Sequence, residues 1–208
     1  MASVRKVVTR AESQQYTREE ILDSAEELFL ADGLHGTTVA KIAAEAGRTQ
    51  GAIYGNFDSK ENLCAEVLLR RGMRMLDEIF SKMSGLLDDP VGPLVESWQV
   101  IAGDDDLVAL LIEYAIAVHK NPEQLEVSRG HVEMGLGMLE TVLSGTLPLG
   151  TPLEERDAGA KGVASAALGL ALSQALGFVS ETEASALLER TIRIWIADLA
   201  TAQGSPGS

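Results

Sequence analysis

Apolar residues recur every three to four positions through most of the 208-residue chain, a spacing that predicts amphipathic helices. In the first such stretch the inward positions are Ile21, Leu22, Ala25, Leu28 and Phe29. Thr17 and Glu20 precede it with the spacing of a capping box, so we expect the helix to begin at Thr17. Gly33 should end it, because glycine favours the residue just past a helix. The polar residues 1–16 are expected to form a flexible arm.

Two short helices are predicted next, joined by the turn Gly-Arg-Thr at 47–49. Thr38 can cap the first of them and Thr49 the second. Ile53 and Phe57 are four residues apart and should face the first helix. Small residues lie where these two helices would cross, and the second helix is left exposed. This arrangement is typical of a helix-turn-helix, which lays its second helix in the major groove of DNA.

The rest of the chain predicts only further helices and hence an all-α fold of about nine helices. Asp58 to Glu61 begin a long helix that should run to about Met83. The later helices are predicted at 92–101, 105–120, 122–144, 153–178 and 182–202. We expect a DNA-binding domain at 17–62, a larger helical domain at 63–203 and a flexible tail at 204–208.

Composition is that of a cytoplasmic globular protein. Hydrophobic residues make up 46% of the chain and charged residues 23%. No apolar run is long enough to span a membrane, and the N-terminus lacks the layout of a signal peptide. The single cysteine, Cys64, cannot form an internal disulfide and is expected to be a packing residue.

The net charge of −14 argues at first against a nucleic-acid partner. The acidity is uneven, however: residues 1–60 carry a net charge of −2 and residues 61–208 carry −12. Arg5, Lys6 and Arg10 lie in an acid-free N-terminal segment that could enter a minor groove, although a disordered tail is the simpler expectation. DNA binding at one end of the molecule is compatible with this distribution.

Several side chains of the turn and the second helix suit DNA. Gln50 can read adenine through its amide, whereas the Tyr54 hydroxyl and the Lys60 ammonium suit phosphate oxygens. Arg48 could reach a guanine edge or a phosphate; alternatively its stem covers the turn and its charge stays in water. Gly51 and Gly55 lack side chains that would hold the helix away from the groove.

Residues 37–63, "TTVAKIAAEAGRTQGAIYGNFDSKENL", resemble the DNA-binding domain of the tetracycline-repressor (TetR) family of transcription regulators. The resemblance covers roughly 17–70 closely and the remainder only in helix number and length. It implies a homodimer on a palindromic operator and a small-molecule effector, of unknown identity, that binds the larger domain and releases DNA. It also implies that the protein is a repressor; an activator, or a regulator without an effector, would use the same DNA-binding domain.

By position, the resemblance implies phosphate contacts for Thr38, Tyr54 and Lys60 and base contacts for Gln50, Gly51 and Gly55. The full set of candidate DNA-binding residues is Thr38, Arg48, Thr49, Gln50, Gly51, Tyr54, Gly55, Asn56 and Lys60. The sequence departs from the family at two places. Arg48 stands where the family mostly has an apolar residue, and Gly55-Asn56 stand where an aromatic-histidine pair is frequent. The operator sequence of a relative therefore does not carry over to this protein.

Candidates in the larger domain are less specific. Effector-binding candidates are Phe80, Trp98, Glu113, Tyr114, Met134 and Met138, although core packing is the simpler explanation of the apolar ones. Glu113 could attract a cationic compound or lie on a solvent-facing stripe. Neither a catalytic cluster, a cofactor motif nor metal-ligand spacing is present, so the sequence predicts a binding protein and no enzyme.

A stripe of small residues on the helix 153–178 would let a second helix approach closely. The expected dimer-interface residues are of two kinds. Those of the stripe are Gly162, Ala166, Gly169, Ser173 and Gly177, and the bulky ones on the helix 182–202 are Leu188, Ile192 and Trp195. The alternative is that the same stripe packs within one chain.

Overall fold

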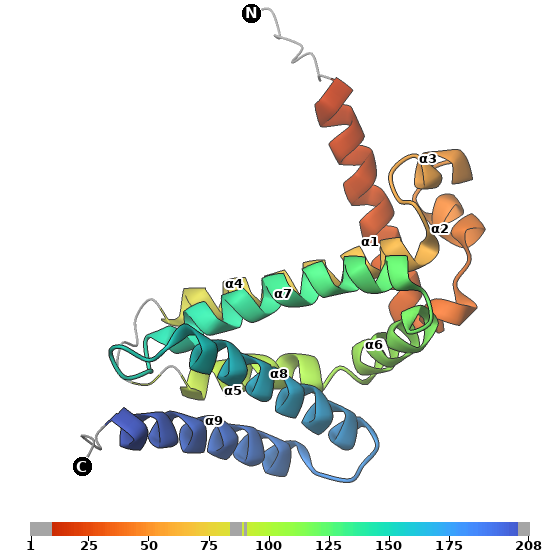
Figure 1. Ribbon diagram of the computed structural model, residues 1–208. Coiled ribbons are helices and arrows are strands. Elements are labelled where there is room, and N and C mark those ends of the chain that lie inside the picture. Colours follow the sequence, from red (N-terminus) through yellow and green to blue (C-terminus); the bar gives the residue numbers. More distant parts are fainter. Residues whose placement is uncertain (1–9, 84–88, 90, 204–208) are drawn as a thin grey trace, which may run out of the picture.

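The computed structural model describes residues 10–83, 89 and 91–203. Over these residues the regular secondary structure is all α-helix, without a strand, as the sequence predicts (Figure 1). The helices are α1 (Arg10–Gly36), α2 (Val39–Glu45), α3 (Gln50–Tyr54), α4 (Lys60–Met83), α5 (Val91–Ala102), α6 (Asp105–Val118), α7 (Pro122–Ser144), α8 (Leu153–Ala175) and α9 (Glu181–Gln203).

The first helix begins earlier than predicted. α1 begins at Arg10, so 10–16 are helical, while the remainder of the expected arm and the expected tail lie outside the described residues. Thr17 is inside the helix, where its hydroxyl donates to the carbonyl of Ser13 at 3.0 Å. The predicted capping box is therefore wrong, because Thr17 has no helix start to cap and Glu20 binds Arg48 instead.

The end of α1 matches its prediction. Gly33 leaves the helical region with φ 73° and ψ 173°, a conformation that is essentially restricted to glycine. The chain then turns, and the buried Thr37 donates its hydroxyl to the carbonyl of Leu28 at 3.0 Å. Thr38 begins α2 by accepting a hydrogen bond from the backbone of Lys41, which confirms it as the cap. This break brings α2 back against α1.

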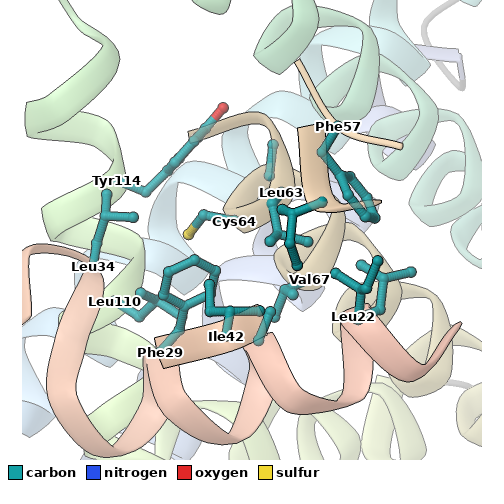
Figure 2. Close-up of a cluster of buried hydrophobic side chains, with 14 of the residues drawn as sticks. Leu22, Phe29, Leu34, Ile42, Phe57, Leu63, Cys64, Val67, Leu110 and Tyr114 are labelled. Atoms are coloured by element: carbon teal, nitrogen blue, oxygen red, sulfur yellow. The ribbon is translucent and has the colours of Figure 1, made fainter. Parts of the chain in front are cut away.

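Side chains from five helices form the first hydrophobic core (Figure 2). Its fully buried large members are Ile21, Phe29, Leu34, Ile42, Ile53, Phe57, Leu63 and Leu110. Leu110, Tyr114 and Val118 belong to α6, so this core extends from α1–α3 across α4 into the larger domain. The predicted domain division at 62/63 therefore does not coincide with a gap in the packing.

The second core fills the larger domain. Trp98 of α5 packs there and donates its indole N–H to the carbonyl of Ala167 in α8 at 3.2 Å. Val108, Leu143, Val163, Leu188 and Ile192 bring α6, α7, α8 and α9 into the same cluster. The long helix α4 contacts α1, α5 and α7, and it connects the two cores because Leu63 and Val67 belong to the first and Met75 packs against the second.

An ion-pair network joins α1, α4 and α6 beside the first core. Glu26 of α1 is 9% exposed and accepts hydrogen bonds from Arg70, Arg71 and Arg74 of α4. Arg71 also donates to Asp104, which caps α6. Burial alone would raise the pKa of Glu26, but hydrogen bonds from Arg70 and Arg74 outweigh it and lower the pKa below its ordinary value of 4.5. The network stabilises the charged carboxylate.

We predict that Glu26→Gln lowers the free energy of unfolding at pH 7 by about 1–3 kcal/mol, because the arginines lose their shared acceptor. The folded-state pKa is lowered, so this stabilisation is present above pH 4.5 and is lost as the pH falls through the folded-state value. Urea unfolding between pH 7 and pH 3 measures the free energy of unfolding of both proteins. The difference between wild type and Glu26→Gln should narrow as the pH falls below 4.5. Glu133→Gln, which changes an exposed carboxylate on α7, is the control. A pH-independent difference would contradict the charge argument.

α8 and α9 meet at a glycine. An added Cβ at the buried Gly159 would lie 1.7 Å from Cζ2 of Trp195, so the indole ring occupies the space of a side chain. Trp195 thereby packs within its own chain, at the second core.

Gly159→Ala should therefore lower the free energy of unfolding by about 1–3 kcal/mol, because Trp195 must move. The control is Gly130→Ala on α7, where an added Cβ meets no atom within 4 Å, and helix propensity predicts a gain of up to about 1 kcal/mol. Thermal or urea unfolding measures both. Equal changes in the free energy of unfolding for the two variants would show that Trp195 leaves room for a methyl group at position 159.

Candidate nucleic-acid interface

The second short helix is held by its cap and by two buried residues. The hydroxyl of Thr49 accepts a hydrogen bond from the backbone of Ala52 at 3.2 Å, as predicted for a cap. Ile53 is 1% exposed and Phe57 2%, and both lie in the first core. The anchored residues fix one face of α3, which leaves the opposite face in solvent.

That free face carries the candidate DNA-reading residues. Gln50, Gly51 and Gly55 are exposed, and the Tyr54 residue is 56% exposed although it is large and apolar. Asn56 is half-buried and donates its amide to the carbonyl of Ala52 at 2.8 Å. The structure thus leaves Gln50, Gly51, Tyr54 and Gly55 exposed on the short helix α3 and its end, and α3 lies beside α2 (Figure 1).

Arg48 forms an ion pair with Glu20 of α1. Its Nε donates to Oε2 of Glu20 at 3.1 Å, and its Nη2 binds the same carboxylate oxygen. The side chains of both residues are about one third exposed. The alternative expectation, that the charge of Arg48 stays in water, is met in part, because the side chain is about one third exposed and pairs with Glu20. A DNA contact by Arg48 stays a prediction.

Lys60 and Thr38 have structural contacts in the chain free of DNA. The ammonium of Lys60 donates to the carbonyls of Leu34 and Thr37, at 2.6 Å and 3.0 Å. The hydroxyl of Thr38 is occupied as the cap of α2. Phosphate binding by either residue stays a prediction, and for Lys60 it would compete with these carbonyls.

Every Lys and Arg from residue 11 to 63 has an internal partner. Besides Arg48 and Lys60, these are Arg18, which pairs with Glu66 and lies 4.6 Å from the ring centre of Phe57, and Lys41, which contacts Asp32 at 3.0 Å. The same segment contains ten acidic residues against these four basic ones. The basic candidates Arg5 and Lys6 lie outside the described residues, and so does the side chain of Arg10.

Glu113 lies at the break in α1. One carboxylate oxygen accepts from the backbone N–H of His35 at 3.2 Å and lies 3.3 Å from its Nδ1. Burial raises the pKa of Glu113, but the hydrogen bonds from His35 and from the backbone of Leu34 outweigh it, so the pKa is lowered overall. Glu113 therefore links α6 to α1 although its side chain is still 36% exposed, and an effector contact by this residue stays a prediction. Its isolation among apolar residues was the signal in the sequence.

The other effector-binding candidates do not surround one cavity. Tyr114 lies in the first core with its hydroxyl 2.6 Å from that of Ser128, whereas Trp98 and Met138 belong to the second core. Met134 is 47% exposed, and the side chain of Phe80 is outside the description. Tyr114, Trp98 and Met138 thus pack in two different cores, and an effector contact by any of these candidates stays a prediction.

The expected dimer-interface residues divide into two groups. Leu188 and Ile192 are buried in the second core, so they cannot meet another chain without rearrangement. Gly177 lies past the end of α8 with φ 73°, where it terminates the helix. Gly162 and Gly169 remain exposed, with no atom within 4 Å of an added Cβ. Nearby, Leu168, Leu187 and Ile194 expose 55%, 44% and 51% of their surface.

Other kinds of site are absent from the part of the chain that the structure describes. It contains no group of three or more His, Cys, Asp or Glu residues placed to hold a metal ion. In the same part, no helix has both the length and the apolar character needed to cross a membrane. Cys64 is fully buried, and burial raises the pKa of its thiol to about 12, which suits a packing residue.

Known proteins share both the sequence and the fold. A family model described as bacterial regulatory proteins of the tetR family matches residues 21–67. The HTH-type transcriptional repressor KstR2 of Rhodococcus jostii is 31% identical over 133 residues, which are 59% of this chain and 63% of that protein. The aligned part thus spans less than two thirds of this curated relative.

Solved structures agree over most of the chain. A TetR-family transcriptional regulator from Rhodococcus sp. matches with a TM-score of 0.71 at 14% identity, covering 88% of this chain and 99% of that chain. The repressor FadR of Thermus thermophilus, solved in complex with lauroyl-CoA, matches with a TM-score of 0.63 at 19% identity, covering 86% and 92%. The helix-turn-helix geometry and the two comparisons lead to one conclusion: residues 21–67 match the tetR family of bacterial regulatory proteins, and the chain shares the fold of solved regulators of that family.

Proposed function

We propose that this protein regulates transcription by binding DNA through α3, and that it acts as a repressor. The observation that carries the proposal is the free face of α3, where Gln50 and Tyr54 are exposed on a helix anchored by Ile53 and Phe57. A helix held in this way can enter a major groove without losing its own packing. The relatives named above are regulators of transcription and not enzymes.

The protein would bind DNA as a homodimer on a palindromic operator. The exposed glycines of α8 and the exposed apolar side chains of α9 support such a pairing, because small residues let helices approach closely and the apolar ones gain by burial. Two DNA-binding domains related by a two-fold axis would occupy half-sites about one or two helical turns apart.

A small molecule bound in the larger domain would release the operator. The lauroyl-CoA complex of FadR supports an effector in a protein of this fold, although the low identity carries no ligand over to this chain. The packing of Tyr114, Trp98 and Met138 in separate cores favours the alternative, a regulator without an effector. A thermal-shift panel of metabolites separates the two, since a ligand that binds only the folded state raises the melting temperature.

We predict that Gln50→Ala and Tyr54→Phe impair DNA binding in different ways. Gln50→Ala should relax the preference at one base position by about 1–3 kcal/mol, because a bidentate amide contact is lost. Tyr54→Phe should weaken binding to all sequences by a similar factor, because a phosphate contact carries no sequence information. Selection of bound DNA from a random pool, followed by Kd measurements, checks both. An unchanged base preference in Gln50→Ala would refute its assignment as a reader.

The proposed dimer gives a separate prediction. Gly169→Gln should shift the protein toward monomers by at least about tenfold in the dimer Kd, because a long side chain on α8 prevents close approach. Gly130→Gln on α7 is the matched control, since neither glycine has an atom within 4 Å of an added Cβ. Sedimentation equilibrium measures the oligomeric state. Equal dimerisation of both variants would place the interface elsewhere.

A further inference from the structure

The ion pair between Glu20 and Arg48 lies where the helix-turn-helix would meet DNA. Arg48 occupies the turn between α2 and α3, one residue before Thr49, the cap of α3. Glu20 reaches it from α1, and both Nε and Nη2 of the guanidinium bind one oxygen of the carboxylate. A carboxylate thus occupies the donors with which an arginine would bind a phosphate or a guanine.

The fold does not need this pair to position α3. The orientation of α3 is set by Ile53 and Phe57 in the first core and by the cap at Thr49. An ion pair with both side chains about one third exposed adds little to stability, because water and salt screen it. Such a pair can be exchanged for another partner at small cost.

The surrounding charge makes the exchange matter for DNA binding. Arg18, Lys41 and Lys60 are also occupied by internal partners, so the DNA-binding domain offers little unpaired positive charge from residue 11 to 63. Charge-charge attraction to any duplex is correspondingly weak, and a cation released from its partner changes affinity markedly.

We propose that Glu20 is an intramolecular competitor of DNA for Arg48 and thereby sets the discrimination between operator and unrelated DNA. On an operator, α3 enters the groove closely enough for Arg48 to exchange Glu20 for a DNA acceptor. On an unrelated duplex the fit is loose, and Arg48 stays with Glu20. The inference rests on the proposed DNA-binding function and deepens it, since it assigns a specificity role to a residue of α1.

Glu20→Gln tests the inference, because it removes the charge that holds Arg48 and keeps the size of the side chain. Affinity for an unrelated duplex should rise roughly two- to tenfold, and its log K against log salt slope should steepen by about 0.9, the value for one added phosphate contact. Affinity for a selected operator should rise less, so the specificity ratio falls. Fluorescence anisotropy at several salt concentrations gives both quantities.

Two further variants isolate the cause. In an Arg48→Gln background, Glu20→Gln should change affinity for the unrelated duplex less than twofold, since no arginine is left to release. Asp157→Asn on α8, which breaks an exposed ion pair with Lys161 and changes the net charge equally, should have no effect. A gain that persists without Arg48 would refute competition and indicate general repulsion.

One result for Glu20→Gln would overturn the competitor role. If Glu20→Gln weakens operator binding and lowers the melting temperature, the pair is a clamp that positions α3, and the competitor role is overturned. Failure of the proposed function itself appears differently, as the absence of any selected duplex that the wild-type protein binds. The melting temperature of each variant, measured without DNA, shows that it is folded.

Discussion

The hydrophobic core that α6 shares with the DNA-binding domain is the constraint on which the rest of the structure depends. α1, α2, α3, α4 and α6 all contribute to this core, and Figure 2 shows Leu110 and Tyr114 of α6 beside Phe29 and Leu34 of α1. The helix-turn-helix is therefore not an independent unit joined by a linker. Its packing is completed by a helix of the larger domain, so a displacement of α6 must disturb α1 or be resisted by it.

Polar contacts at the start of α6 and in its second half fix its position against α1. At its start, Asp104 shares Arg71 with Glu26 of α1. Further along, Glu113 reaches the break that Gly33 makes in α1, where an added Cβ at the glycine would lie 2.8 Å from the carboxylate. Apolar side chains can slide past one another, whereas these charged groups have fixed partners. They hold α6 in one register against α1, so a shift of α6 along α1 would have to break these contacts.

The sequence predicts the helices well because periodicity and caps are local properties. Thr38, Thr49 and Gly33 do what their types suggest, and helices far from the matched family segment lie within a few residues of their predicted bounds. Partners distant in the chain were not predictable. Glu20 has the spacing of a capping box and binds Arg48 instead, and Leu188, which suits a dimer interface, is buried in its own chain. Local pattern does not encode which of several surfaces a side chain will meet.

The charges of the DNA-binding domain follow from the same packing. Acidic residues outnumber basic ones between residues 11 and 63, and the basic ones there are engaged by Glu66, Asp32, Glu20 and backbone carbonyls. Within residues 11–63, general attraction to phosphates adds little affinity, because each cation must first leave an internal partner. If α3 binds DNA as proposed, neutral donors such as Gln50 and Tyr54 and the fit of α3 in the groove carry correspondingly more of the affinity. Weak general attraction is an advantage for a regulator, since unrelated DNA competes with the operator in vast excess.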